Sequence, residues 1–529
     1  MKLPTTLSLD ALYANATPLS VAATMALVLL TYAALPNAQE RAVRHLPTPA
    51  SSIPIFRNTF AIMSKHGRRI YDWLLENCIA FDEKPWRMQV LGRPVTVVLC
   101  SVEAFEHILK TKFDCFIKGE YTTGVLKDLL GDGIFAADGE LWAHQRKTAS
   151  HLFSHQMMRD TMEIVVRDHC ELLCQRLRAI SQQENNVVEF KRLLDLFTMD
   201  VFTRIGFGVD FGSLKESSNS ESKNNPFLLA FERTSQGIMY RFQQPMWLWQ
   251  LKRWLNVGVE RQLKQDIAVI NTTVNEIIAK SIAAKSSGDK REQRRDLISL
   301  FIEKNPAETV DPALIRDMTI SFIAAGRDTT SQSMSWVLLM LNRHPHVLAK
   351  LREELKTKVP QLQTGNTTPS MEDIQDLVYL EAVVKESMRL NPVVGITTRT
   401  AAVDTTLHDG TFVKAGTRIV LSNYVQARLP SVWGPDATEY KPERWIDPST
   451  GKIRQFSPFK FAVFLAGPRT CLGMKFALME MKVTLAVLFS KFELRTVRDP
   501  HTFTYRASMT MSVAFGIKLK GLVTDRMLP

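Results

Sequence analysis

Apolar residues recur with helical spacing along most of the chain. Positions three and four residues apart repeat in long runs, which is the pattern of helices that bury one face. The runs span 102–110, 139–153, 155–181, 188–206, 226–242, 259–285, 312–343, 345–358, 371–390 and 474–490. Asp311-Pro312 predicts a capped helix start, and Pro360 and Pro392 predict the ends of two helices. The pattern therefore predicts a mainly α fold.

Strand-like patterns are short. Residues 88–100 predict two strands around a Gly92-Arg93-Pro94 turn. Further short strand-like pieces lie in 411–421 and 502–519. We therefore expect small peripheral β-sheets around the helical globule. The polar, charged run 286–295 predicts a surface loop.

An almost uncharged stretch from Thr17 to Leu35 lies near the amino terminus. Its roughly 19 residues are enough for one helix to cross the hydrocarbon core of a bilayer. Arg41 and Arg44 follow the stretch, whereas Lys2 is the only basic residue before it, and this asymmetry would keep the main domain cytosolic. The sequence therefore predicts a membrane anchor, with a cleaved signal peptide or a buried helix as the alternatives.

The composition fits a large intracellular globule that meets a charged surface. The chain has 529 residues, of which 45% are hydrophobic, so it can bury a large core. Its six cysteines are scattered without a Cys-x-x-Cys pair, which favours a reducing compartment. The formal net charge is +12, but Lys and Arg are dispersed, so an anionic membrane or an acidic protein fits better than nucleic acid. The chain has no glycine fingerprint for flavin or nucleotide binding.

One cysteine lies where the pattern predicts a helix start. Cys471 follows the turn-prone Ala466-Gly467-Pro468 and precedes the apolar-periodic run 474–494. Unpaired N–H groups and the helix dipole favour negative charge there, so we expect a thiolate that acts as a metal ligand or a nucleophile. A buried structural cysteine is the alternative.

The residues around Cys471 form the pattern Phe-x-x-Gly-x-Arg-x-Cys-x-Gly. This spacing resembles the haem loop of the cytochrome P450 family. The resemblance implies haem b, held without covalent attachment, with Cys471 as the axial ligand of the iron. It also implies that Phe464, Arg469 and Gly473 border the haem.

The predicted long helix from Pro312 contains Ala325-Gly326-Arg327-Asp328-Thr329-Thr330. Glycine and threonine weaken the helix ladder here, so the helix can open a groove. In the family that the chain resembles, an acid and alcohol pair lies over the haem iron. The resemblance implies that Asp328 and Thr329 are catalytic and deliver protons during oxygen activation. A solvated helix face is the alternative for these residues taken alone.

Two further matches concern the carboxylates of the haem. Trp142 and Arg146 are four residues apart, so both side chains can reach one carboxylate from the same helix face. Arg399 resembles the second carboxylate anchor of the family. By the same resemblance, all three residues are cofactor-binding.

A structural ion network is also implied. Glu386 and Arg389 are one helical turn apart and can pair locally. Arg444, in Pro442-Glu443-Arg444-Trp445, resembles the residue that completes a buried network behind the haem loop in this family. Loss of any member would leave an uncompensated buried charge.

In chain order these matches cover the sequence from about residue 46 to the end. They imply two parts: residues 1–45, with the anchor at about 17–35, and a haem-thiolate monooxygenase domain at 46–529. Activity would use O2 and NADPH-derived electrons, delivered by a separate NADPH-cytochrome P450 reductase, with cytochrome b5 as a further candidate donor. We expect a single-pass protein of the endoplasmic reticulum membrane with a cytosolic catalytic domain and no nucleic-acid partner.

Three segments look similar to the fatty-acid and alkane ω-hydroxylase group: 129–135, 249–256 and 322–330. This suggests a long aliphatic substrate that is oxidised near its end. By family analogy the substrate pocket would be lined by Phe322, Ala325, Val394, Ile396 and Met509. The stretch 246–255, with Trp247, Trp249 and Trp254, is amphipathic and would dip into a bilayer, or else pack as a helix junction in the core.

Two other functions are compatible with a haem-binding chain. One is a haem-thiolate isomerase or dehydratase that rearranges a hydroperoxide. The other is a non-catalytic haem-binding membrane protein that senses or carries a ligand. The intact pair Asp328 and Thr329 argues against both.

Overall fold

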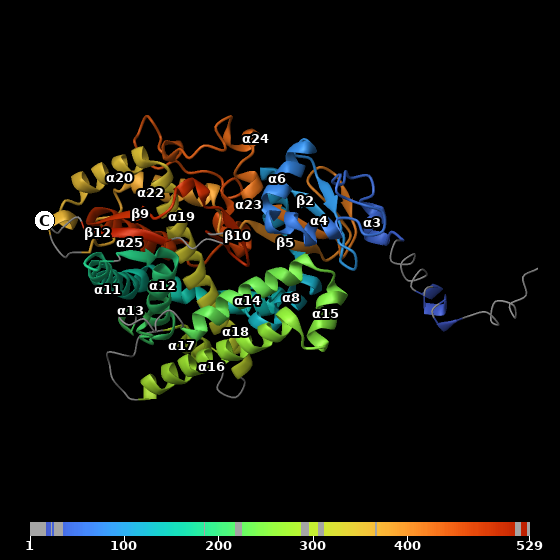
Figure 1. Cartoon of the computed structure of the whole chain (residues 1–529), viewed down its shortest axis with the longest axis horizontal. Helices are drawn as coiled ribbons and strands as arrows, with labels where there is room; N and C mark the ends of the chain where they lie inside the picture. The colour runs from blue at the N-terminus through green and yellow to red at the C-terminus, as the bar shows by residue number, and fades with distance from the viewer. Residues whose placement is uncertain are drawn as a thin grey trace, which may run out of the picture.

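The computed structural model describes residues 17–18, 20–22, 24–25, 35–184, 186–216, 225–286, 296–304, 311–364, 368–513 and 520–525. Helices make up most of this part, and small sheets lie around them (Figure 1). The mainly helical class predicted from periodicity is therefore confirmed.

The α-helices vary from single turns to long rods. They are α3 (Ala38–Ala42), α4 (Thr59–Met63), α5 (Lys65–Arg68), α6 (Ile70–Ala80), α7 (Val102–Glu106), α8 (Glu120–Leu130), α9 (Gly139–Ser150), α10 (His155–Met157), α11 (Glu163–Ser181), α12 (Phe190–Phe207), α13 (Ser213–Glu216), α14 (Pro226–Gln243), α15 (Met246–Trp254), α16 (Gly258–Ser286), α17 (Leu297–Lys304), α18 (Pro312–Ile323), α19 (Thr329–Arg343), α20 (Pro345–Lys358), α21 (Gln361–Thr364), α22 (Val378–Leu390), α23 (Asn423–Gln426), α24 (Pro430–Trp433) and α25 (Met474–Lys491). Single π-helical turns are η1 (His107–Thr111), η4 (Met158–Met162) and η6 (Ala324–Asp328).

The strands are short. They are β1 (Trp86–Met88), β2 (Thr96–Leu99), β3 (Phe116–Ile117), β4 (Val187–Glu189), β5 (Ile396–Ala401), β6 (Thr405–Thr406), β7 (Phe412–Val413), β8 (Arg418–Ser422), β9 (Phe492–Thr496), β10 (Tyr505–Ala507), β11 (Met511–Val513) and β12 (Lys520–Asp525). The largest sheet has the order β1-β2-β8-β5-β3, with β2 and β8 parallel and its other pairs antiparallel. A second sheet has the order β4-β12-β9, and β10-β11 and β6-β7 are hairpin-like pairs.

Two helices form the centre of the helical part. Residues 330–341 of α19 and 479–491 of α25 are buried on every side. A helix that is buried all round must be enclosed by other elements. Accordingly α22 packs against both α19 and α25, and α11 and α20 flank α25 (Figure 1). This core fixes the helix that follows Cys471.

The predicted helix 312–343 forms as one continuous helical segment that is interrupted by a π-helical turn. α18 passes through the π-turn η6 into α19, as the weak helix ladder at Gly326 leads us to expect. A Cβ on Gly326 would lie 2.0 Å from Cδ2 of Phe202 on α12. Only glycine permits this approach, so α12 lies directly against the π-turn.

Several boundaries differ from the sequence prediction. Periodicity did not predict α6 or α8, because these helices hold polar residues or a glycine within a short run. The helix predicted to begin at residue 371 begins at Val378, after a series of turns. Short helices bury few residues, so their pattern is weak.

Most of the predicted anchor at 17–35 lies outside the described residues, as does nearly all of the predicted loop at 286–295. None of the described helices is both long enough and apolar enough to cross a membrane.

Candidate functional site

The loop before α25 presents Cys471 on a rigid path. The backbone N–H of Cys471 donates to the carbonyl of Phe464 at 2.8 Å and closes the loop. Gly467 has a φ of +68°, and a Cβ there would lie 2.0 Å from the carbonyl oxygen of Leu109. Leu465 also adopts a positive φ, 57°, which is unusual for a branched residue. The chain therefore accepts backbone strain to hold the cysteine in this position.

The surroundings of Cys471 act on its thiol in opposite directions. The residue is exposed in the described structure, yet nearby protein atoms desolvate the sulfur and raise the pKa of the thiol above its ordinary value. The N–H of Gly473 and the guanidinium of Arg146 oppose this rise. The thiolate therefore stays a prediction, and a bound metal ion would itself deprotonate the sulfur.

Helix α9 lies against this loop. Arg469 pairs with Asp138, the residue that precedes α9, at 2.5 Å between Nη2 and Oδ1, and donates to the carbonyl of Ala137 at 3.1 Å. The same guanidinium lies 4.3 Å from the ring centre of Trp142. Arg146 is 5.9 Å from that ring. The structure thus brings Trp142, Arg146, Arg469 and the cysteine loop together.

Three cations, Lys118, Arg399 and Arg469, lie near Asp138 at the start of α9. Arg399 is 1% exposed and donates through Nη1 to the carbonyl of Thr398 at 2.9 Å. Its Nε and Nη2 have no hydrogen-bond partner among the residues that the structure describes. Burial, and then the charge of Arg469, lower the pKa of Arg399 to about 10. Burial and the same two guanidinium groups lower the pKa of Lys118 well below its usual value.

Asp138 is the only acid among the groups that shift the pKa values of Lys118, Arg399 and Arg469. Asp138 raises the pKa values of Lys118, Arg399 and Arg469, and its Oδ2 accepts from the backbone N–H of Lys118 at 2.8 Å. Three cations around one carboxylate leave an excess of positive charge. An anionic ligand with carboxylate groups would balance that charge and use the free nitrogens of Arg399.

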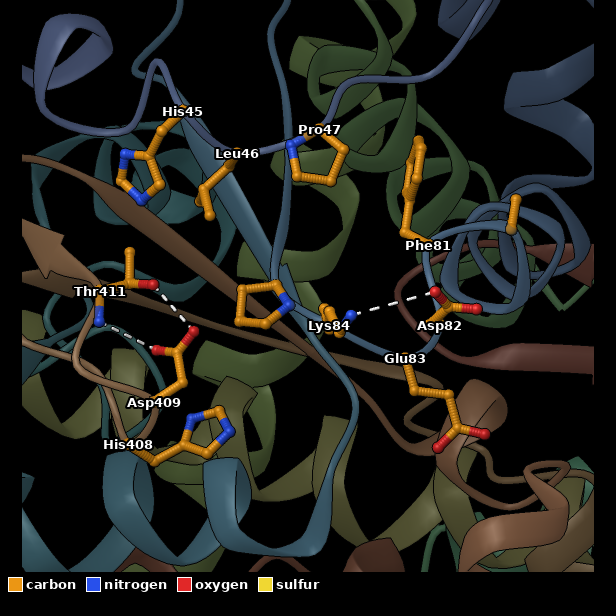
Figure 2. Close-up of a pocket in the computed structure, with 12 residues that line it drawn as sticks. His45, Leu46, Pro47, Phe81, Asp82, Glu83, Lys84, His408, Asp409 and Thr411 are labelled. Atoms are coloured by element: carbon orange, nitrogen blue, oxygen red, sulfur yellow. Dashed lines mark hydrogen bonds and ion pairs between the residues drawn. The ribbon is translucent and has the colours of Figure 1, made fainter.

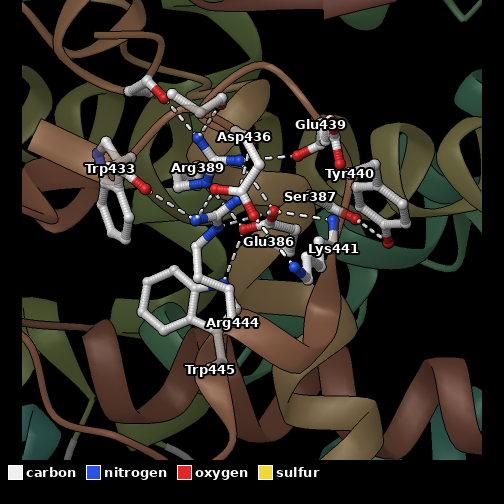
Figure 3. Close-up of polar contacts among 12 residues, drawn as sticks. Glu386, Ser387, Arg389, Trp433, Asp436, Glu439, Tyr440, Lys441, Arg444 and Trp445 are labelled. Atoms are coloured by element: carbon white, nitrogen blue, oxygen red, sulfur yellow. Dashed lines mark hydrogen bonds and ion pairs between the residues drawn. The ribbon is translucent and has the colours of Figure 1, made fainter. Parts of the chain in front are cut away.

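The predicted ion network is assembled around Glu386, which is fully buried (Figure 3). Arg389 donates to both carboxylate oxygens of Glu386 at 2.8 Å. Arg444 approaches Oε1 at 3.5 Å and donates to Asp436 Oδ1 at 2.8 Å. Arg389 also donates to carbonyls of the segment 427–439. The three predicted members therefore lie together.

Two further donors to Glu386 were not predicted from the sequence. The indole N–H of Trp445 donates to Oε2 at 2.9 Å, and the backbone N–H of Lys441 donates to Oε1 at 2.9 Å (Figure 3). Trp445 follows Arg444 directly in Pro442-Glu443-Arg444-Trp445, so its position in the sequence could have indicated this contact. The ring centres of Trp433 and Trp445 are 5.6 Å apart, yet the indole N–H of Trp433 has no partner among the described residues.

The acid and alcohol pair lies at the π-turn. Thr329 donates through Oγ1 to the backbone carbonyl of Ala325 at 2.6 Å. Ala325 belongs to the π-turn. Asp328 is 8% exposed, and Arg327 Nη2 lies 3.2 Å from its Oδ1. Thr510, on the turn between β10 and β11, donates to Asp328 Oδ2.

Arg327 does not face open solvent. It is 1% exposed and lies 4.8 Å from the ring centre of Phe231. On the α12 side, Asp195 accepts from Ser331 at 2.6 Å and pairs with Lys191 at 2.5 Å. Lys191 and Asp195 are four residues apart on α12, whereas Ser331 lies 136 residues from Asp195, so no local motif could have indicated the contact between Asp195 and Ser331.

The predicted pocket residues belong to segments that meet near Asp328. Met511 N–H donates to the carbonyl of Val393 at 2.7 Å, which places the hairpin carrying Met509 beside the segment 393–396. Phe322 is buried, and the others, Ala325, Val394, Ile396 and Met509, are partly buried. The hairpin therefore contacts the segment 393–396 through Met511 and the π-turn through Thr510.

A separate cavity of about 690 Å³ lies elsewhere (Figure 2). It is lined by residues of the segment 45–47, of the loop 80–85 and of the β6–β7 turn, including His408 and Asp409. None of the predicted site residues lines it, so it does not belong to the candidate site.

The chain is mainly helical and brings a cysteine loop, Trp142 and several cations together. Comparison with known proteins identifies the family. A sequence model of the family described as Cytochrome P450 matches residues 47–519. The chain belongs to the cytochrome P450 family, and it is therefore a monooxygenase.

Similar proteins occur in plants. Cytochrome P450 CYP94D108 of Paris polyphylla is 34% identical over 451 residues, which cover 84% of this chain and 86% of that protein. Cytochrome P450 94B1 of Arabidopsis thaliana is 33% identical over 463 residues, covering 86% and 88%. Cytochrome P450 704B1 of the same plant is 33% identical over 488 residues, covering 85% and 90%.

Membership implies a haem iron cofactor, O2 and electrons from a reductase. The residues present fit a haem, since the cations near Asp138 and the two nitrogens of Arg399 that lack a partner among the described residues suit its carboxylates. Cys471 supplies a sulfur on a loop held by backbone contacts to Phe464 and Leu109.

We expect Trp445→Phe to destabilise the protein by about 1.5–3 kcal/mol, because Glu386 would lose a donor to its buried charge. Thermal or denaturant unfolding of the full chain measures this. Trp433→Phe is the matched control, since it shrinks a neighbouring ring without breaking a described hydrogen bond. Equal losses for the two variants would contradict the role given to the Trp445 N–H.

Proposed function

We propose that the protein is a haem-thiolate monooxygenase that hydroxylates a long-chain fatty acid or alkane near its end. The proposed haem site rests on the cations near Asp138, beside the Cys471 loop, where the buried Arg399 has two nitrogens without a partner among the described residues. The substrate side rests on the three segments that resemble ω-hydroxylases and on the apolar character of Phe322, Val394, Ile396 and Met509.

In this proposal Cys471 ligates the iron. Arg399, Arg469, Trp142 and Arg146 hold the haem carboxylates by charge and hydrogen bonds. The bound haem supplies the chemistry of O2 reduction and C–H oxidation. The reaction balances as RH + O2 + NADPH + H⁺ → ROH + H2O + NADP⁺.

In this proposal, side chains at the π-turn deliver the protons. Thr329 holds a proton at Oγ1, which it now donates to the Ala325 carbonyl. Asp328 precedes Thr329 in the chain and would feed protons to it, while its two carboxylate oxygens contact Arg327 and Thr510. Arg327 is turned to Asp328 and Phe231, so we do not assign it to a substrate carboxylate.

Incubation with NADPH, a cytochrome P450 reductase and C12 to C18 fatty acids or alkanes tests the substrate class. We expect product hydroxylated near the chain end, together with a spectral shift on binding, because the pocket positions are apolar. Sterols and planar aromatic compounds are the comparison set. Omission of the reductase should abolish product. Turnover of the comparison set alone would contradict the assignment.

In addition to the predicted anchor, we propose a second contact with the endoplasmic reticulum membrane through α15. Trp254 is 80% exposed, Trp247 53% and Leu251 44%. The turn at Gly92 lies against the ring of Trp247, and Phe60 on α4 is also exposed. Exposed aromatic and aliphatic residues on a helix with basic residues suit the bilayer interface.

One residue of the predicted patch is wrong. Trp249 is 3% exposed, and its ring lies 4.6 Å from the guanidinium of Arg241. Trp247 and Trp249 are two positions apart on a helix, so they face different sides. Trp247 and Trp254 are seven apart and share a face.

Deletion of residues 1–45 should leave a folded domain that still binds vesicles of anionic lipid, more weakly than the full chain. Trp247→Ser with Trp254→Ser in that domain should lower vesicle binding at least about threefold, because two interfacial rings are lost. Co-sedimentation measures the bound fraction. Phe412→Ser, which removes an exposed ring on β7, is the control. If the double variant and the control bound vesicles equally, the α15 contact would have to be abandoned.

A further inference from the structure

The hydrogen bond between Thr510 and Asp328 joins two parts of the site that lie 182 residues apart. Thr510 is 8% exposed, and so is Asp328. Thr510 Oγ1 donates to Asp328 Oδ2, while Arg327 Nη2 lies 3.2 Å from Oδ1. The carboxylate is thus held from two sides: by its own helix, and by the turn between β10 and β11.

The turn is itself fixed on both sides of Thr510. Ser508 Oγ donates to the carbonyl of Thr510 at 2.5 Å. The N–H of Met511 donates to Val393 at 2.7 Å, and the carbonyl of Met511 accepts from the indole of Trp336 on α19 at 3.1 Å. These contacts set the direction of the Thr510 hydroxyl, so its bond to Asp328 is a consequence of where the turn lies.

The same turn borders the proposed substrate space. Met509 precedes Thr510, and the segment 393–396 lies against the hairpin. A substrate chain that touched Met509 or Val394 would press on the turn that holds Asp328. Because Asp328 is buried, no bulk water is at hand to replace a hydroxyl that moves away.

We propose that Thr510 is a positioning residue that orients the Asp328 carboxylate and so ties proton delivery to the substrate-contacting turn. The inference rests on the proposed function of Asp328. An ionised carboxylate can only accept hydrogen bonds, so Thr510 is the donor and its loss leaves Oδ2 without this partner. Asp328 then turns toward Arg327 alone. Electrons from NADPH are diverted as NADPH + H⁺ + O2 → NADP⁺ + H2O2.

Other charged groups do not replace Thr510. Lys191 is paired with Asp195, and Asp195 also accepts from Ser331. Ser331 Oγ reaches the backbone carbonyl of Asp328 at 3.3 Å and not its carboxylate. The α12 side therefore supports the helix, whereas the hairpin supports the acid.

Three single variants of the full-length, haem-loaded protein separate a positioning role from a structural one. Thr510→Val keeps the shape and removes the hydroxyl, whereas Thr510→Ser keeps the hydroxyl. Ser512→Ala removes a buried hydroxyl from the same hairpin with no described bond to Asp328. Product and hydrogen peroxide are measured per NADPH, with substrate affinity from the spectral shift.

Thr510→Val should lower product per NADPH at least about threefold, with peroxide making up the difference and substrate affinity unchanged. Thr510→Ser and Ser512→Ala should keep the wild-type ratio. A wild-type ratio for Thr510→Val, or a loss that Thr510→Ser fails to rescue, would overturn the proposal.

A second measurement needs no substrate. Thermal unfolding of Thr510→Val, Asp328→Asn and the double variant forms a double-mutant cycle. We expect Thr510→Val to lower the midpoint in the wild-type background, and to have a much smaller effect once Asp328→Asn has removed the charged carboxylate. Additive effects would overturn the inference even if fatty acids are hydroxylated. If fatty acids are not substrates, a non-additive cycle still supports the Thr510 contact.

Discussion

The buried carboxylate of Glu386 constrains the half of the molecule that carries the cysteine loop. An ionised group that is fully enclosed is stable only if its lone pairs are met by donors. Here Arg389, Arg444, Trp445 and a backbone N–H meet them. The same arginines donate to carbonyls between 427 and 439, so an irregular segment without long helices is wrapped around α22.

That segment leads directly to the candidate haem site. Trp445 packs against Phe461 with ring centres 4.6 Å apart, and Phe461 immediately precedes the turn that ends at Phe464. The carbonyl of Phe464 accepts the Cys471 N–H. The position of the sulfur therefore depends, through a short chain of contacts, on the satisfied charge of Glu386. Two groups of charges belong to the candidate site. Cations exceed acids on the α9 side, and at the π-turn Asp328 lies between the guanidinium of Arg327 and the hydroxyl of Thr510.

Features with local causes could be predicted from the sequence. The bounds of α14, α20 and α25 follow from apolar periodicity, because each buries a face along its length. Glu386 and Arg389 pair because they are one turn apart on a helix. The sequence predicted a weakened helix at Gly326, although not the π-turn itself. The contact of Arg469 with Trp142 was not predicted, although both residues were assigned to the cofactor.

Features that depend on packing between distant segments could not be predicted. The bond from Thr510 to Asp328 and the approach of Lys118 to Asp138 have no local pattern. The rise in the thiol pKa of Cys471 comes from desolvation by protein segments around the loop, which have no local pattern either. Trp249 turned inward because a helix of nine residues presents its rings on more than one face.

We propose that Cys471 is the sulfur ligand of the haem. The carbon monoxide spectrum of the reduced protein tests this assignment, since a thiolate ligand shifts the main absorption band to the red. We expect the red-shifted band for the wild-type protein and its loss in Cys471→His, with haem retained. A Cys471→His or Cys471→Ala variant that kept the red-shifted band would contradict it.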